Sequence, residues 1–221
     1  MSSTALVTGA ARGIGRSVAD TLESKGIRVL RPGRQELDLA RSESVSAYLS
    51  GLDETVDILV LNAGINNPEP LQDISAENWS GTQQVNVSAN LQLLQGLLPR
   101  MAAAGYGRVV ALSSVYAHRA RAGRVAYSSS KAAIEEVVRS VAVEYGPFGV
   151  IANCVAPGFV LTDLTYQNND AKQLDALAAR IPIGRLAEPV EIARFISWLV
   201  SAENSYITGQ SIAIDGGFLC L

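Results

Sequence analysis

The sequence predicts an α/β fold with a doubly wound parallel sheet, in a single domain over residues 1–221. Two observations support this. Short apolar runs alternate along the chain with segments of helical periodicity, the pattern of buried parallel strands joined by helices. The first apolar run is followed by a glycine-rich turn and then by a helix. The 221 residues, 48% of them hydrophobic, suffice for one sizeable core, and no linker or repeat divides them.

Charge and special residues exclude several functions. The formal net charge is −3, so no basic surface indicates binding to nucleic acid or to an anionic membrane. No apolar run approaches the roughly 20 residues of a membrane span, and the N-terminus lacks a signal-peptide pattern. Cys154, Cys220 and the single His118 make neither a disulfide framework nor a metal-ligand cluster. We therefore expect a cytoplasmic protein without a metal site.

The first predicted strand, residues 4–7, leads into a turn with the sequence Thr8-Gly9-Ala10-Ala11-Arg12-Gly13-Ile14-Gly15. A helix follows and ends near Gly26. Glycine lets the backbone approach a pyrophosphate, whose charge is favoured at a helix N-terminus. Glycines alone are weak evidence, because loops are rich in them, but the order of strand, turn and helix predicts a dinucleotide-binding turn.

The second predicted strand, residues 27–30, ends at Arg31-Pro32-Gly33-Arg34. A dinucleotide fold that prefers NAD places an Asp or Glu here to hold the ribose 2′-hydroxyl, and this tip has neither. Arg31 and Arg34 flank the tip, Arg12 comes from the glycine turn, and arginine suits a 2′-phosphate. The alternative is a set of solvated loop charges, but the missing acid favours NADP.

Residues 35–39 would form a third strand, yet almost nothing separates them from the second. Parallel neighbours normally need a crossover of about a dozen residues or more. We therefore expect the third strand to be shortened or missing. A short helix is predicted next, at residues 42–49.

A buried strand is predicted at residues 56–61 and ends in Asn62-Ala63-Gly64, a small-residue turn that a cofactor could pass closely. A long helix is expected at residues 77–101. It contains Asn86, although helices gain little from asparagine. A solvent-facing side chain and a functional role are equally compatible with this position.

The chemistry is expected on the following strand and helix. Residues 107–112 form an apolar strand that ends at Ser113-Ser114, on the edge where α/β sheets bind ligands. Tyr127 and Lys131 lie four apart on a helix over residues 127–145 and project from one face. The ordinary pKa of a phenol is about 10, and a neighbouring ammonium lowers it. Tyr127, beside Lys131, could therefore give a proton to a carbonyl oxygen. Taken alone, the two residues are better interpreted as a surface tyrosine and a solvated lysine. The rest of the chain favours the catalytic role.

Between these elements lies a segment that we call the arginine loop, with Arg119, Arg121 and Arg124. Both its ends are tied to the expected site, and arginine binds carboxylate and phosphate. The loop could receive an acidic substrate, and a solvated loop or an oligomer contact is an equal alternative.

The last third of the chain is expected to form a strand at residues 149–156, stopped by Pro157-Gly158, a helix at residues 191–200 and a strand at residues 211–214. The polar segment at residues 161–180 follows a strand end. It suits a movable lid over a substrate.

These pieces occur in one order at suitable spacing, and the chain resembles the short-chain dehydrogenase/reductase family from residue 4 to residue 217. The matching motifs are the turn at residues 8–15, Asn62-Ala63-Gly64, Asn86, Ser114, Tyr127 with Lys131, Pro157-Gly158 and Asp215-Gly216-Gly217. The chain departs from the family after the second strand, where a helix and a full third strand are usual. Its pattern is most similar to the 3-oxoacyl-carrier-protein reductase-like enzymes.

The resemblance implies a Rossmann fold, a nicotinamide cofactor and a catalytic set of Asn86, Ser114, Tyr127 and Lys131. NADPH would deliver hydride to a carbonyl carbon while Tyr127 gives the proton, Ser114 holds the oxygen, Lys131 lowers the Tyr127 pKa and holds the ribose, and Asn86 keeps a water in line. The expected cofactor contacts are Gly9, Arg12, Gly13, Ile14, Gly15, Arg34, Asp38, Leu39, Asn62, Ala63, Gly64, Tyr127, Lys131, Pro157, Gly158, Val160 and Thr162.

The expected substrate is a small or carrier-bound carbonyl compound or secondary alcohol, such as a 3-oxoacyl thioester or another acidic carbonyl compound. One alternative is a non-catalytic protein that senses NADP(H), which an intact Ser114, Tyr127 and Lys131 argues against. Another is a nucleotide-sugar epimerase or dehydratase, whose usual longer C-terminal substrate region has no counterpart here. The resemblance also implies a homodimer or homotetramer on the helices at residues 77–101 and 127–145, which are rich in apolar residues that include Leu91, Leu94, Val137 and Val141.

Overall fold

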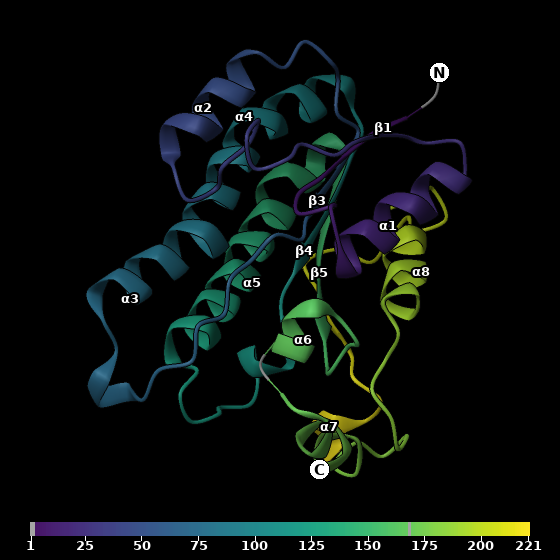
Figure 1. Cartoon of the computed structure of the whole chain (residues 1–221). Helices are drawn as coiled ribbons and strands as arrows, with labels where there is room; N and C mark the ends of the chain where they lie inside the picture. Colours follow the sequence, from purple (N-terminus) through teal and green to yellow (C-terminus); the bar gives the residue numbers. More distant parts are fainter. Residues whose placement is uncertain (1–2, 168) are drawn as a thin grey trace.

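The computed structural model describes residues 3–167 and 169–221. Met1 and Ser2 of the predicted domain and Asn168 of the predicted lid lie outside the described residues. Figure 1 shows a central sheet between two layers of helices, with a smaller helical segment beyond one end of the strands. The α/β fold and the single domain predicted from the sequence are confirmed.

The strands of the sheet are parallel and follow the order β2-β1-β3-β4-β5-β6. Their bounds are β1 (Thr4–Val7), β2 (Arg28–Leu30), β3 (Ile58–Leu61), β4 (Gly107–Leu112), β5 (Val150–Pro157) and β6 (Ser211–Ile214). β1 pairs on both sides, so that Leu6 lies opposite Leu30 of β2 and Leu59 of β3. The strand order therefore reverses beside β1, and the crevice at such a point is where doubly wound sheets bind ligands.

No strand lies beyond β2 in the part of the chain that the structure describes. Residues 34–36 form a turn instead, and the carbonyl of Gly33 accepts hydrogen bonds from the N–H groups of Glu36 and Leu37 at 3.0 and 2.9 Å. Too few residues separate this segment from β2 for a parallel crossover. The expected loss of the third strand is confirmed.

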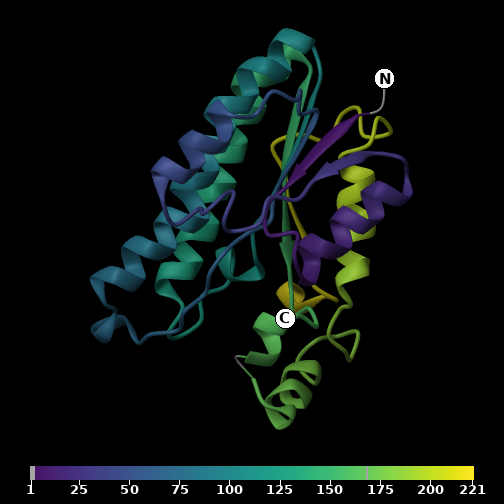
Figure 2. The same cartoon turned by 45° about the horizontal axis from the view of Figure 1, so that its top comes forward.

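Helices cover both faces of the sheet (Figures 1 and 2). On one face lie α1 (Gly13–Ser24) and α8 (Pro189–Leu199), and on the other α2 (Ser42–Ser50), α4 (Ala89–Ala104) and α5 (Val125–Tyr145). The apolar stripe of α1 at Val18, Ala19 and Leu22 is fully buried, as its spacing predicts. Each face of the sheet buries its own apolar cluster against these helices.

The long helix expected at residues 77–101 is continuous but not uniform. It consists of α3 (Ala76–Gln83), a π-helical turn η2 (Gln84–Ser88) and α4. Single π-turns inside α-helices are frequent at functional sites, because they reorient the side chains at the bulge. Asn86 lies in this turn and is 1% exposed, so the solvent-facing alternative is wrong.

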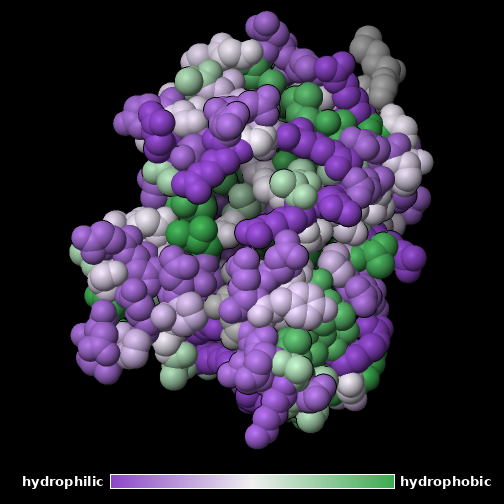
Figure 3. All heavy atoms as spheres, in the orientation of Figure 1, coloured by the Kyte–Doolittle hydropathy of each residue, from purple (hydrophilic) through white to green (hydrophobic). Residues whose placement is uncertain are grey.

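The predicted lid contains α6 (Asp163–Gln167) and α7 (Ala171–Ala178). It lies beyond the ends of the strands and packs in a third apolar cluster with Val115, Ile181 and Phe218 (Figure 2). Figure 3 shows a largely hydrophilic face with several separate apolar patches, one of them in the lower part. The remaining short helical turns are η1 (Leu71–Asp73), η3 (Val115–Ala117), η4 (Gly146–Phe148) and η5 (Phe218–Cys220).

Two of the residues expected to contact a partner subunit lie instead in the core of this chain. Leu94 and Val141 are 1% and 6% exposed and belong to the core of this chain. Leu91 of α4 and Val143 of α5 are 41% and 78% exposed. A partner on these helices would therefore contact Leu91, as the sequence indicates, and Val143, and not Leu94 or Val141. No helix of the described residues is long and apolar enough to cross a membrane.

Candidate active site

A cleft of about 370 Å³ opens at the carboxyl ends of β1, β3, β4 and β5. Most of the predicted site residues line it, which places the glycine turn opposite the Tyr127 helix. The predicted residues in its wall are Gly9, Arg12, Gly13, Ile14, Asn62, Ala63, Gly64, Ser114, Tyr127, Lys131, Pro157, Gly158, Val160 and Thr162. The predicted residues outside its wall are Gly15, Arg34, Asp38, Leu39 and Asn86.

The glycine turn is shaped by a close contact with the end of β3. Gly9 has φ +65°, a left-handed conformation that glycine adopts readily. A Cβ on Gly15 would lie 2.3 Å from Asn62 Nδ2 and 2.4 Å from the Gly9 carbonyl oxygen. Asn62 Nδ2 donates to the carbonyls of Thr8 and Gly9, at 2.9 and 3.2 Å. Gly15 thus lies outside the cleft wall. Because it has no Cβ, Asn62 can approach the turn and hydrogen-bond to it.

This turn fits a pyrophosphate. The first turn of α1 carries no acidic residue, and its N–H groups lack partners within the helix. Negative charge is favourable there because of the helix dipole. The Arg12 guanidinium lies at the same end, 3.7 Å from Asp163 of α6, with both side chains more than half exposed.

The three arginines expected near a 2′-phosphate have different surroundings. Arg31 is committed to α1, with ion pairs of 2.7 Å to Asp20 and 2.8 Å to Glu23. Arg34 is 82% exposed and lies 3.4 Å from Asp38. Of the two arginines at the tip, Arg34 is therefore the more accessible to a ligand.

The side chains of Ser114, Tyr127 and Lys131 converge in the cleft from two elements. Ser114 follows β4 and begins η3, where its Oγ accepts the Tyr116 N–H at 3.1 Å. Tyr127 and Lys131 lie on one face of α5, with the Lys131 Nζ 5.6 Å from the centroid of the phenol ring. Lys131 Nζ donates to the carbonyl of Leu112 at 2.5 Å. The expected juxtaposition of the three side chains is found.

The electrostatics of the pair differ from expectation. Burial raises the pKa of the Tyr127 phenol, while a hydrogen bond with Ser114 and the charge of Arg124 act in the opposite direction. The prediction that the Tyr127 pKa is lowered is therefore wrong for this chain. Burial also lowers the pKa of Lys131 to about 8. Its ammonium is buried beside a carbonyl, and desolvation disfavours the charged form.

Asn86 lies behind the cleft and not in its wall. Its Oδ1 accepts the Ile65 N–H at 2.9 Å, and its Nδ2 donates to the Ile65 carbonyl at 3.0 Å and to Ser130 Oγ at 2.9 Å. A Cβ on Gly64 would meet Asn86 Oδ1 at 3.2 Å and Lys131 Nζ at 3.5 Å. The Asn86 side chain thus ties the end of β3 to α5, and Gly64 leaves room for both.

The arginine loop divides into two parts. Arg119 turns away from the cleft and donates to the carbonyls of Phe218 and Leu221, at 3.2 and 3.1 Å. Arg121 and Arg124 line the cleft. Arg121 donates to Tyr116 Oη, and Arg124 donates to Asn66 Oδ1 at 2.7 Å. Within the described residues neither forms an ion pair with a carboxylate. Burial, and then the charge of Arg121, lowers the pKa of Arg124, as expected for two cations that share a wall.

Two cleft residues, Arg121 and Arg124, belong to the loop that the sequence indicates for an acidic substrate. The cleft residues that the sequence does not single out are Asn66, Leu112, Ser113, Tyr116, Phe159, Asp163, Thr165 and Asn169. Most follow the end of a strand or belong to the lid, so position in the fold was the available signal. The described chain holds no group of three or more His, Cys, Asp and Glu residues that could bind a metal.

Comparison with known proteins agrees with this site. The sequence profile described as Enoyl-(Acyl carrier protein) reductase matches residues 35–219. The 3-oxoacyl-(acyl-carrier-protein) reductase FabG of Vibrio cholerae is 35% identical over 234 residues, which cover 96% of each chain.

Solved structures give the same result. Gluconate 5-dehydrogenase of Burkholderia cenocepacia, in complex with NADP and tartrate, has a TM-score of 0.89 at 26% identity and covers 99% of this chain and 96% of its own. Ligand-free aldohexose dehydrogenase of Thermoplasma acidophilum has a TM-score of 0.94 at 26% identity, covering 100% and 95%. The sheet order, the glycine turn and the full-length match together place the chain in the short-chain dehydrogenase/reductase family of NAD(P)-dependent oxidoreductases.

Proposed function

We propose that this enzyme interconverts a carbonyl compound and a secondary alcohol with NADP(H), and that its substrate carries an acidic group near the reacting carbon. The observation that carries the proposal is the shared cleft. Ser114, Tyr127 and Lys131 lie in it together with Arg121 and Arg124, two cations without a carboxylate partner among the described residues.

The proton chemistry follows from the surroundings of Tyr127. Because burial raises its pKa, the phenol stays protonated near neutral pH and can act as the general acid in carbonyl reduction. Ser114 Oγ is positioned to hydrogen-bond the same carbonyl oxygen as negative charge develops on it. Arg124 then favours the phenolate that remains after proton transfer, since its charge lowers the Tyr127 pKa.

The glycine turn, Asn62, Gly64, Lys131 and Thr162 would hold the cofactor along the cleft. A nicotinamide cofactor, when bound, supplies the hydride or accepts it. Arg12 and Arg34 support NADP over NAD, because Arg12 lies in the glycine turn, Arg34 is exposed after β2, and arginine binds a phosphate well. Lys131 would donate to the ribose, and Asn86 would act from behind by tying Ile65, after β3, to Ser130, the neighbour of Lys131 on α5.

The acidic substrate is supported by the wall of the cleft and by the relatives. A half-buried arginine such as Arg124, without an acid partner among the described residues, favours an anionic ligand, since its charge is otherwise only partly compensated. Gluconate and tartrate, which the similar dehydrogenase acts on or binds, both carry carboxylates. A 3-oxoacyl thioester on a carrier, the substrate in the name of the other relative, places its charges farther away. The geometry favours a small carbonyl compound with its own carboxylate.

The first experiment tests the reaction. A panel of acidic and neutral carbonyl compounds is screened with NADPH by the absorbance of the cofactor, for the native enzyme and for Tyr127→Phe. The variant keeps the ring, so NADPH should bind normally while kcat falls by about 100-fold or more. Near-normal turnover in Tyr127→Phe, or the absence of turnover in the native enzyme, would count against the proposal.

The second experiment tests the acid group. Arg121→Ala and Arg124→Ala should raise KM for an acidic substrate and leave KM for a neutral one unchanged, because each removes a cation from the cleft. Arg119→Ala is the matched control, since Arg119 belongs to the same loop but faces Phe218 and Leu221. Added salt should shrink the difference for the exposed Arg121, because salt screens exposed charges. If all three variants treat acidic and neutral substrates alike, the loop has no role in recognition.

A further inference from the structure

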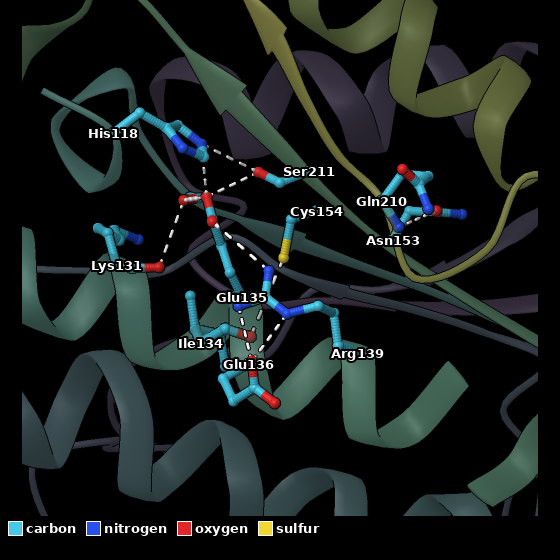
Figure 4. A network of polar contacts seen from close by, with 11 residues as sticks. His118, Lys131, Ile134, Glu135, Glu136, Arg139, Asn153, Cys154, Gln210 and Ser211 are labelled. Atoms are coloured by element: carbon cyan, nitrogen blue, oxygen red, sulfur yellow. Dashed lines mark hydrogen bonds and ion pairs between the residues drawn. The ribbon is translucent and has the colours of Figure 1, made fainter. Parts of the chain in front are cut away.

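The buried carboxylate of Glu135 is not part of the cleft and is not used in the reaction above. Glu135 lies on α5, one turn beyond Lys131, and its side chain is 6% exposed. Burying a carboxylate is unfavourable unless hydrogen bonds or cations compensate it. Figure 4 shows the contacts that do so here.

One oxygen of this carboxylate accepts hydrogen bonds from two serine hydroxyls and lies beside a histidine. Glu135 Oε1 accepts Ser113 Oγ at 2.5 Å and Ser211 Oγ at 2.6 Å, and His118 Nε2 lies 3.0 Å from it. The other oxygen is 4.0 Å from Arg139, whose guanidinium bonds more closely to Glu136, at 2.7 Å. The close contacts of Glu135 are therefore those of Oε1, of which the one with Ser113 is buried and those with Ser211 and His118 lie nearer the surface.

These three neighbours of Glu135 Oε1 come from segments that carry the site. Ser113 directly precedes Ser114, and its Oγ also lies 3.4 Å from the Lys131 carbonyl. His118 follows η3 and directly precedes the arginine loop. Ser211 begins β6, which leads to Asp215. Glu135 thus joins three separate segments to the helix that holds Tyr127 and Lys131.

We propose that Glu135 is a positioning residue of this enzyme, which holds Ser114 and the start of the arginine loop in register with Tyr127 and Lys131. This rests on the proposed reaction, because register matters only if Ser114 and Tyr127 act on the same carbonyl oxygen. The two ends of the network have separate tasks. Ser113 transmits the constraint to Ser114, and His118 transmits it to the loop that receives the acidic group of the substrate.

The contact also favours one tautomer of the histidine. A carboxylate oxygen accepts hydrogen bonds and donates none, so the approach of Nε2 to Glu135 is favourable when Nε2 carries a proton. Ser211 Oγ lies 3.4 Å from the same nitrogen and is itself a donor to Glu135. Because His118 is the only histidine in the sequence, its ring nitrogens give a signal that no other residue overlaps.

The test uses Glu135→Ala, Glu135→Gln and Ser113→Ala, with Glu136→Gln as the matched control. Glu136 is the neighbouring residue on α5, but its side chain is 68% exposed, and its one ion-pair partner among the described residues is Arg139. In Glu135→Ala, kcat should fall by about 10-fold to 100-fold, the cost of a misplaced group, while the dissociation constant for NADPH changes by less than about twofold. Glu135→Gln keeps an acceptor oxygen and should recover part of kcat, and Ser113→Ala should lower kcat with a smaller effect on folding.

A spectroscopic readout checks the network without turnover. Nitrogen-15 NMR should find the neutral His118 ring as the Nε2–H tautomer in the native enzyme and in Glu136→Gln, and a mixture of tautomers in Glu135→Ala. The proposal is overturned if folded Glu135→Ala and Ser113→Ala both keep kcat within about twofold of the native value. It is also overturned if kcat and NADPH affinity fall together in proportion to the unfolded fraction. An inactive Tyr127→Phe beside a fully active Glu135→Ala refutes this inference alone, whereas a native enzyme without turnover refutes the proposed function with it.

Discussion

Replacing Gly15 by alanine tests how the glycine turn is held open. The new Cβ would lie 2.3 Å from Asn62 Nδ2 and 2.4 Å from the Gly9 carbonyl oxygen, far inside van der Waals contact. One of these atoms belongs to the backbone, so relief requires a shift of the turn or of Asn62. Either movement weakens the two hydrogen bonds that Asn62 Nδ2 donates to Thr8 and Gly9, at 2.9 and 3.2 Å.

The expected magnitude follows from three contributions to the free energy of unfolding. Overpacking costs about 1–3 kcal/mol, and two lost hydrogen bonds cost about 1 kcal/mol each. Alanine gains about 1 kcal/mol over glycine inside a helix. Gly15→Ala should therefore destabilise the protein by about 2–4 kcal/mol and lower Tm by about 4–16 °C, and it should weaken NADPH because the turn has moved.

The assay is thermal and urea unfolding, together with fluorescence titration of NADPH. The matched control is Gly81→Ala in α3, where no atom lies within 4 Å of the new Cβ and φ is not positive. That variant should be stabilised by about 0.5–1 kcal/mol with unchanged NADPH binding, since alanine costs less backbone entropy. If both variants shift stability in the same direction by the same amount, the close approach at Gly15 is not what the glycine is needed for.

Three further predictions concern the cofactor, pH and assembly. Arg34→Ala should weaken the binding of NADPH by about 1–3 kcal/mol and barely affect the binding of NADH. Arg31→Ala should leave the preference for NADPH intact, because Arg31 is paired with residues of α1. Equal affinities of the native enzyme for both cofactors would refute this prediction. The pKa of Lys131 is lowered to about 8 in the folded chain, so between that pH and about 10.5 the unfolded state holds more protons and stability rises with pH. The rise should total about 3 kcal/mol and be missing in Lys131→Met, as urea unfolding at successive pH values can measure. Light scattering should give a mass of two or four chains of 23.3 kDa, and Val143→Asp should lower it if α5 lies at the contact; a native monomer at micromolar concentration would contradict the assembly.

The strands and most of the site could be predicted from the sequence, because their signals are local. Apolar runs such as residues 107–112 mark buried strands wherever they occur, and the residues after each run must share one edge of a parallel sheet. This is why Ser114 and Asn62 were placed in the same cleft as Tyr127. The loss of the third strand was also local, since it follows from the length of chain after Leu30. The reductase FabG of Vibrio cholerae and the two sugar dehydrogenases, which match over nearly their full length, favour an oxidoreductase over the sensing protein and the nucleotide-sugar enzyme.

What could not be predicted depends on tertiary contacts. Arg31, Arg34 and Arg119 look equivalent in the sequence, but ion pairs with α1 engage the first and the carbonyls of Phe218 and Leu221 engage the last. The raised pKa of Tyr127 depends on how deeply the phenol is buried, which no spacing reveals. Glu135 reads as a solvated residue of a helix, because nothing local indicates that Ser113, His118 and Ser211 meet above it.

The exposed edge of the sheet at β2 affects the tendency of the chain to pair with strands of other molecules. Without a third strand, three residues of β2 would have to present an open row of backbone donors and acceptors, and long exposed edges of this kind recruit strands from other chains. Here the row is too short to seat another strand, and it begins at Arg28, whose guanidinium pairs with Glu54 at 2.8 Å. Pro32 follows just beyond and offers no N–H to an incoming strand. The chain can therefore dispense with a protecting strand at this edge and still not be a template for intermolecular β-sheet growth.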